Sequence, residues 1–337
     1  MDRVLNRVAL CGLVVLMGAS ATIAVALGPA DITPGEVWAS IAHHLGFAAE
    51  TPLSRLRDAI VWELRLPRVL SAMGVGAGLA VAGAVMQALT RNPLADPYLL
   101  GLSSGAALGA VVLVVIGASA LIPLGAFAGS LAALALALAL AHLLGGTTPS
   151  RAILAGISIS ALATAMTSFV IFWSATGDSY REILTWLMGS LGGSTWLDAG
   201  LVALVLVVST PILLLSARGL DAFAFGEASA ASLGIDVGRT RWLLLGVSAL
   251  LTGVMVAIGG AIGFVGLVVP HAVRLAVGPG HVRLLPLSML VGAIFMLWAD
   301  TVARTLFDPR ELPVGIVTAL VGSPIFLLVL MRFRRST

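Results

Sequence analysis

Long apolar runs separated by short polar segments repeat along almost the whole chain. A helix needs about 20 predominantly apolar residues to cross a bilayer, and nine runs come close to that length. They lie at 8–27, 69–89, 98–116, 124–144, 151–173, 197–216, 242–262, 284–304 and 313–331. A tenth, shorter run at 264–277 is interrupted by Pro270, His271 and Arg274. The pattern predicts an all-α integral membrane protein, one transmembrane domain over 1–337 with about ten transmembrane helices.

Short motifs predict where several helices begin and turn. TPGE at 33–36 has the spacing of a capping box with proline at the first helical position, so we expect a short external helix over 34–45. TP at 148–149 and DP at 96–97 begin the spans that follow them in the same way. GAS at 117–119 is the natural turn between two successive spans.

Composition supports a membrane protein. The chain is 59% hydrophobic and 10% charged, with a mean hydropathy of +1.07, whereas a soluble domain is about 25% charged. The first run, Val8–Leu27, is longer than the core of about 7–15 residues in a secretory signal. We therefore interpret it as the first transmembrane helix.

Arginines predict the orientation of the chain. All 19 residues of the combined lysine and arginine count are arginine, and five lie near the ends: Arg3, Arg7, Arg332, Arg334 and Arg335. Cytoplasmic segments carry an excess of positive charge, so we expect the N and C termini to be cytoplasmic. Ten spans then leave seven arginines outside, which need another explanation: Arg55, Arg57, Arg65, Arg68, Arg181, Arg304 and Arg310.

Several chemistries are excluded or disfavoured. Without lysine the chain cannot contain the phosphate-binding motif G-x-x-x-x-G-K-[ST], so it is not expected to be an ATPase. The histidines are scattered without ligand spacing, so no metal or other cofactor is expected in this chain. Asp300 is the one acid near a span. It lies toward the outer end of its helix beside Trp298, which favours a capping or interfacial role over a proton relay.

The loop at 217–241 is the longest predicted cytoplasmic segment. Apolar residues alternate there with Asp221, Glu227 and Asp236, and predict one or two short amphipathic helices ending at Gly234. Helices that lie on lipid are usually rich in lysine and arginine on their polar face. The acidic residues therefore favour docking to another protein.

Hydroxyl side chains share one face of the span at 151–173. They are Ser160, Thr164, Thr167 and Ser168. Such hydroxyls either line a polar path or form hydrogen bonds across helices, and the sequence favours neither.

Three separated motifs carry a family resemblance. They read RNPLADPYLLGLSSGA at 91–106, GFVGLVVPHAVRL at 263–275 and ELPVGIVTALVGSPIFLLVL at 311–330. They resemble the permease subunits of type II bacterial ABC importers, which are the iron-siderophore, haem and vitamin B12 permeases. The likeness runs from about Trp62 to Arg332. We interpret the signature in the first motif as structural, because glycines four residues apart let helices pack closely: Arg91, Asn92, Pro93, Asp96, Pro97, Gly101 and Gly105.

The resemblance implies an assembly. It implies a homodimer in the bacterial cytoplasmic (inner) membrane, with a path at the dimer axis lined chiefly by the fifth and tenth helices. It also implies two cytoplasmic ATPase subunits, which would bind ATP and magnesium, and an external substrate-binding protein. The segment at about 218–241 matches the family's coupling segment, at Phe225, Gly226, Glu227, Ala230, Leu233 and Gly234. The hydroxyls of the fifth span are candidates for the translocation path.

The resemblance also offers a role for three external arginines. LRLPR at 64–68 and ADTVAR at 299–304 resemble the stretches with which this family docks its binding protein. They imply docking by Arg65, Arg68 and Arg304, because bidentate contacts between arginine and carboxylate fix orientation as well as attraction. The alternative is contact with lipid headgroups or internal pairing, for example of Arg65 with Glu63.

The motifs do not select a cargo. The sequence predicts a permease for an iron chelate, either a ferric siderophore or haem, with vitamin B12 or another corrinoid as the alternative. A secondary transporter, or a membrane anchor without a transport role, are the competing classes.

Overall fold

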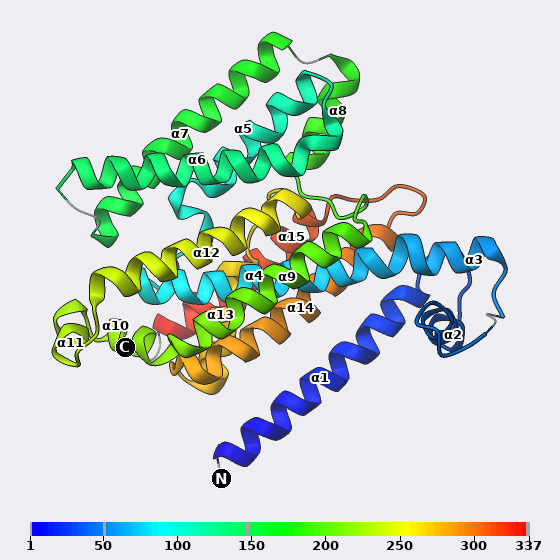
Figure 1. Ribbon diagram of the computed structural model, residues 1–337, viewed down its shortest axis with the longest axis horizontal. Helices are drawn as coiled ribbons and strands as arrows, with labels where there is room; N and C mark the ends of the chain where they lie inside the picture. The colour runs from blue at the N-terminus through cyan, green and yellow to red at the C-terminus, as the bar shows by residue number, and fades with distance from the viewer. Residues whose placement is uncertain (1, 50–51, 146–147, 175, 335–337) are drawn as a thin grey trace.

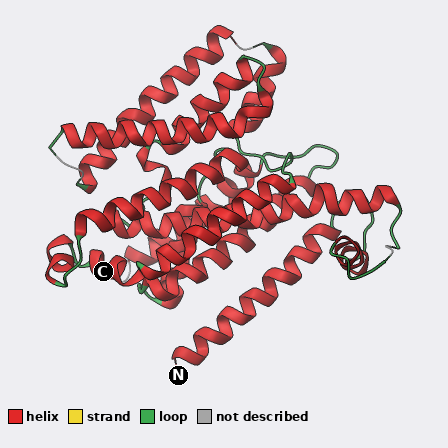
Figure 2. Ribbon diagram, viewed as in Figure 1, coloured by secondary structure: helices red, strands yellow, loops and turns green. Residues whose placement is uncertain are grey.

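The chain is built from helices joined by short loops. The computed structural model describes residues 2–49, 52–145, 148–174 and 176–334, and this described part contains no strand (Figure 2). Within it, ten helices coincide with the ten predicted spans: α1 (Asp2–Ala26), α4 (Leu66–Thr90), α5 (Leu102–Val115), α6 (Ile122–Leu143), α7 (Pro149–Ser174), α9 (Trp196–Leu215), α12 (Val237–Gly259), α13 (Val265–Val277), α14 (His281–Thr305) and α15 (Val314–Arg334). Six helical stretches in the described residues are long and apolar enough to cross a membrane, and α1, α5, α13 and α15 carry shorter apolar stretches. The prediction of an all-α membrane protein with about ten spans is confirmed.

Short helices lie at the two ends of the molecule. At one end are α2 (Pro34–His44), α3 (Arg55–Ala59), the π-helical turn η1 (Ile60–Arg65) that leads into α4, and α8 (Gly177–Leu187). At the other end are α10 (Ala217–Ala224) and α11 (Glu227–Ser232), near the C-terminal end of α15 (Figure 1). From the predicted orientation we refer to the first as the outer end and to the second as the inner end.

Helix α4 lies at the centre of the larger group of helices, and most of its residues are buried (Figure 1). Helices α9, α12, α13 and α14 pack around it. A Cβ atom on Gly76 would lie 2.2 Å from the carbonyl oxygen of Gly292 on α14. Small residues at such positions allow two backbones to meet. Helices α4 and α14 therefore form a close pair between the outer and inner ends.

Helices α5, α6 and α7 form a second group, shown above the first in Figure 1. Gly105 and Gly109 of α5 face α6, where Cβ atoms would lie 2.3 and 2.0 Å from the carbonyl oxygens of Gly129 and Gly125. The two helices therefore touch along their glycines, as the spacing predicts. The turn predicted between them contains the short helix η3 (Ser119–Leu121).

The beginnings of two helices test the sequence motifs. Helix α2 begins as predicted, with a capping box in which the Glu36 carboxylate accepts from the backbone N–H of Thr33 at 2.8 Å. The prediction that Asp96 begins a transmembrane helix is wrong. Asp96 caps the single turn η2 (Pro97–Leu100), and α5 begins only at Leu102. The break occurs at Gly101, whose φ of +84° redirects the chain.

Candidate functional site

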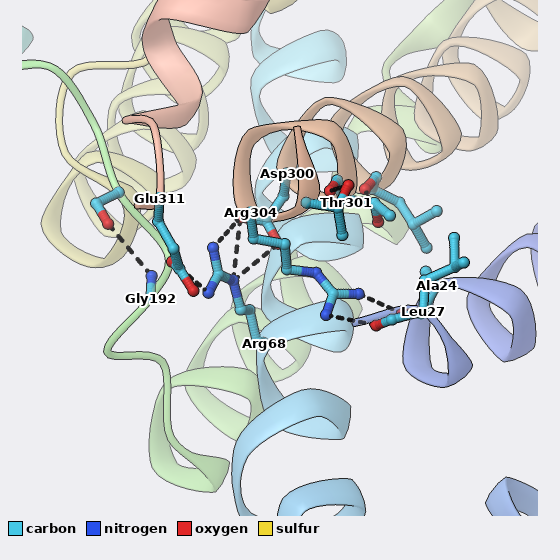
Figure 3. A network of polar contacts seen from close by, with 11 residues as sticks. Ala24, Leu27, Arg68, Gly192, Asp300, Thr301, Arg304 and Glu311 are labelled. Atoms are coloured by element: carbon cyan, nitrogen blue, oxygen red, sulfur yellow. Dashed lines mark hydrogen bonds and ion pairs between the residues drawn. The ribbon is translucent and has the colours of Figure 1, made fainter. Parts of the chain in front are cut away.

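Arg68 forms a buried ion pair at the outer end of the molecule. Its Nε donates to Asp300 Oδ2 at 2.9 Å and its Nη2 donates to Asp300 Oδ1 at 3.0 Å, so the pair is bidentate (Figure 3). Arg68 Nη1 also donates to Glu311 Oε2 at 2.8 Å. Asp300 is 1% exposed. The capping or interfacial role expected for Asp300 is therefore wrong, because the carboxylate pairs with Arg68 inside the protein.

Arg65 and Arg304 cap the outer end of α1. The last carbonyl groups of a helix lack partners within it and carry a partial negative charge. The two guanidinium groups donate to carbonyl oxygens at and just beyond this end, those of Ala24, Val25, Ala26, Leu27 and Ala30 (Figure 3 shows the contacts of Arg304). Arg65 bonds Val25 and Ala26 at 2.9 Å each, and Arg304 bonds Leu27 at 3.1 Å. This capping gives both arginines a structural role in addition to any docking role.

The three arginines line one polar hollow of about 430 Å³ at the outer end. Gly28, Gly192, Asp308 and Glu311 are among its other lining residues. Each of the three arginines is less than a tenth exposed, while the Glu311 side chain is 52% exposed. Arg65 is paired within the protein, but its partners are carbonyl groups of α1 and not Glu63, which is exposed. A partner's acid must enter the hollow to reach the arginines.

The coupling segment forms two short helices at the inner end, α10 and α11. Phe225 and Leu233 are 81% and 72% exposed, whereas Ala230 is buried against the protein. Gly226 and Gly234 have φ angles of +102° and +80°, which suit glycine at the turns before and after α11. Glu227 forms an ion pair with Arg241 of α12. The segment therefore exposes two large apolar side chains, while Ala230 and Glu227 attach it to the rest of the protein.

The signature turn between α4 and α5 lies beside this segment. Arg91 ends α4 in the left-handed region, and a Cβ atom on Gly226 would lie 3.6 Å from its Nη1. Asn92 Oδ1 accepts from the backbone N–H of Leu94 at 2.9 Å, and Asp96 Oδ1 accepts from that of Tyr98 at 2.8 Å. Burial raises the pKa of the Asp96 carboxyl to about 6. Asn92 and Asp96 of the turn therefore accept hydrogen bonds from the backbone of the chain itself.

Two further signature residues continue this turn. Pro93 is partly buried between α4 and η2, and Pro97 opens η2 and is buried. Proline suits the first position of a helical turn, because its ring fixes φ and no N–H is left unpaired there. Both residues therefore shape the backbone of the turn.

The four hydroxyls predicted on α7 do not share one environment. Thr167 is buried and donates to the carbonyl of Ala163 at 2.8 Å, and Ser160 is partly buried near Gly101. Thr164 and Ser168 are exposed. Thr167 therefore forms its hydrogen bond within its own helix, which is neither of the two alternatives expected from the sequence.

The sequence reasoning missed one hydroxyl within the predicted span at 151–173. Ser158 is exposed and donates to the carbonyl of Leu154 at 3.0 Å. It lies on the same helical face as the exposed Ala161, Ala165 and Ser168, at offsets of three, seven and ten residues. That spacing was available in the sequence, but the isoleucines on both sides of Ser158 concealed it. Small and hydroxyl side chains thus form one exposed strip of α7, beside large exposed apolar side chains such as Leu162 and Phe169.

The fold and these features define a class: a multi-pass transport permease of the ABC importer type in the cytoplasmic membrane. The chain belongs to the FecCD transport family, whose model matches residues 14–332. The cobalamin import system permease protein BtuC of Halobacterium salinarum is 42% identical over 330 residues, covering 97% of this chain and 88% of that protein. The hemin transport system permease protein HmuU of Yersinia pestis is 46% identical over 286 residues, with coverages of 82% and 84%.

A solved structure supports the same assignment. It is described as a metal-chelate type ABC transporter in an inward-facing conformation, and it superposes with a TM-score of 0.83 at 34% identity. The superposition covers 96% of this chain and 99% of that one. Within the described residues no group of three or more histidine, cysteine, aspartate or glutamate side chains is arranged to hold a metal ion.

Proposed function

We propose that the chain is the membrane subunit of an ATP-driven importer for a metal chelate. The observation that carries the proposal is the exposed pair Phe225 and Leu233 on the coupling segment. Exposed large apolar side chains on a segment that also carries Asp221, Glu227 and Asp236 fit a protein partner better than a lipid surface. A cytoplasmic ATPase that holds both side chains in a cleft would drive the permease, since this chain lacks a phosphate-binding lysine. The chain itself would need no cofactor.

The outer hollow is the proposed docking site for an external substrate-binding protein. Arg65, Arg68 and Arg304 provide positive charge there, and Glu311 is the exposed acid that now pairs with Arg68. An acidic side chain of the binding protein can replace Glu311 on Arg68 Nη1 while Asp300 keeps its bidentate contact. Exchange of one carboxylate for another leaves no buried charge unpaired.

We further propose a homodimer in which α7 and α15 of each copy line the path. The exposed side of α7 carries Ser158, Thr164 and Ser168 among larger apolar side chains, and no charged residue follows Arg151 within the helix. Such a face suits a large cargo that must pass without being held tightly. Ser160 and Thr167, which are less accessible, would support this face and not contact the cargo.

The proposed cargo is an iron chelate, either haem or a ferric siderophore. A corrinoid is the second candidate, because a relative that covers nearly the whole chain is named for cobalamin import. The binding protein encoded with this permease would discriminate them. Its dissociation constants for haem, a ferric hydroxamate and cobalamin identify the cargo, and tight binding of cobalamin alone would refute the iron chelate.

Reconstitution tests the class of transporter. The permease is placed in lipid vesicles with its partner ATPase, and uptake of the three labelled compounds is measured with the binding protein outside and ATP inside. We expect uptake to require both ATP and the binding protein. A secondary transporter would take up cargo without the ATPase, and a membrane anchor would show no uptake. Phe225→Ser with Leu233→Ser should abolish binding of the ATPase, whereas Leu197→Ser, a change at another exposed leucine (81%), should not.

A further inference from the structure

A single carboxylate joins the coupling segment to the beginning of α14. Asp221 Oδ1 on α10 accepts from the backbone N–H of His281 at 2.9 Å and from its ring Nδ1 at 2.6 Å. A carboxylate can only accept hydrogen bonds, so Nδ1 carries the proton in this contact. The His281 side chain is 4% exposed and that of Asp221 is 38% exposed. The contact therefore joins a buried imidazole ring to a partly exposed carboxylate of the coupling segment.

This carboxylate supplies a cap that α14 lacks. The first N–H groups of a helix have no partners within it, and α14 is preceded by Gly280, which offers no side chain. Asp221 comes from 60 residues earlier and fills that position. Its negative charge also faces the positive end of the helix dipole. Loss of Asp221 would uncap α14 and remove this polar link to α10, while Leu220 and Phe223 of α10 stay buried in the core.

Helix α14 extends from this contact to the outer hollow. Its 25 residues correspond to a length of about 37 Å at 1.5 Å per residue. Asp300 and Arg304, near its far end, hold Arg68 and the carbonyls of α1. The coupling segment is therefore tied to the same helix that carries part of the proposed docking site.

We propose that Asp221 and His281 are positioning residues through which the coupling segment and α14 move together. The proposal rests on the proposed function, because it requires an ATPase at the inner end. Glu227 provides the second attachment, to α12, through Arg241. Movement of α10 by the ATPase would then displace α14 and change the outer hollow, and docking at the hollow would act in the reverse direction.

The test compares Asp221→Ala with Asp221→Asn in the reconstituted complex. Uptake per ATP hydrolysed is measured for haem, a ferric hydroxamate and cobalamin. Alanine removes the acceptor of both hydrogen bonds, so we expect a loss of coupling of about tenfold or more, since one charged hydrogen bond is already worth about that much. Asparagine keeps an acceptor oxygen and should retain most of the coupling. Equal losses in both variants would show that the charge of Asp221, and not its hydrogen bonds, matters, and would overturn the proposal.

Asp198→Ala is the matched control. Asp198 carries the same charge and also accepts a backbone N–H at the beginning of a helix, that of Thr195 at 2.8 Å, but it lies on α9, outside the coupling segment. Coupling should stay within about twofold of the unaltered protein. If Asp221→Ala fails to assemble, His281→Ala is measured in its place, since it removes only the ring contact; it should lose part of the coupling, and no loss would overturn the proposal. If Asp221→Ala assembles, the double variant should be no worse than Asp221→Ala. Absence of uptake by the unaltered complex would refute the proposed function. An active complex in which Asp221→Ala remains coupled would refute only this inference.

Discussion

The buried ion pair at the outer end allows a ranking of three substitutions by their cost to stability. Arg68 contacts two acids, Asp300 at 1% exposure and Glu311 with a side chain 52% exposed. Replacing Arg68 with methionine leaves the Asp300 carboxylate buried without its bidentate partner. Breaking a buried pair in this way costs about 3–5 kcal/mol. We therefore expect Arg68→Met to be the most damaging of the three.

Substitutions of the two acidic partners of Arg68 should cost less stability, for different reasons. Asp300→Asn leaves Arg68 with Glu311, and the amide oxygen of asparagine still accepts one hydrogen bond, so about 2–3 kcal/mol is expected. Glu311→Gln removes an ion pair that water already screens, so the cost should be about 1 kcal/mol or less. The double change Arg68→Met with Asp300→Leu removes both charges and should recover part of the loss of Arg68→Met alone.

Equilibrium unfolding in mixed detergent micelles measures these free energies. Asp178→Asn is the control, because Asp178 is exposed in the first turn of α8 and its loss should cost less than about 1 kcal/mol. The reasoning is refuted if Glu311→Gln is as damaging as Arg68→Met. It is also refuted if the double variant is less stable than Arg68→Met, because the cost would then not arise from an unpaired buried carboxylate.

Three further outcomes can be checked on the same preparation. Glu311→Gln should raise the affinity of the binding protein for the outer hollow several-fold in a surface-binding assay, because it removes the acid that competes for Arg68; weaker binding would contradict the exchange. Gly109→Ala should cost more than about 2 kcal/mol, since its Cβ meets backbone at 2.0 Å, whereas Gly200→Ala has open space and should be neutral or stabilising. The raised pKa of Asp96, about 6, means that the folded state binds the proton more tightly. Stability should therefore fall as pH rises from about 4 to about 6 and then level off, and Asp96→Asn should remove that slope.

The fold was largely predictable because membrane spans obey a length rule. A bilayer requires about 20 apolar residues in a row, and each predicted run contains a helix within a few residues of its expected bounds. The interruption at Pro270 did not break α13, which continues through it as a shorter helix. Local motifs predicted the beginning of a helix correctly where a single capping residue determines it, as Thr33 does for α2. They failed at Asp96, because the chain changes direction at the left-handed Gly101, five residues after Asp96.

The polar contacts could not be predicted, because they join residues that are far apart in the chain. Asp300 and Arg68 are separated by 232 residues and Asp221 and His281 by 60. Amphipathic spacing identifies the face of one helix, but the register of one helix against another depends on the close approach of backbones, such as that at Gly76 and Gly292. Sequence reasoning could say that seven external arginines needed partners. It could not say that two of them cap α1.

The capping role changes how the arginines should be tested. Replacing Arg65 and Arg68 together with glutamate would place negative charge against the carbonyls of α1 and beside Asp300, so lost uptake could reflect lost folding. Glu311 avoids this difficulty, because its exposed carboxylate is the one member of the cluster whose removal leaves the capping and the buried pair in place. A binding protein that docks by carboxylate exchange must respond to Glu311→Gln with tighter binding, and one that docks elsewhere must not respond. Docking can therefore be measured at Glu311 without unfolding the outer end.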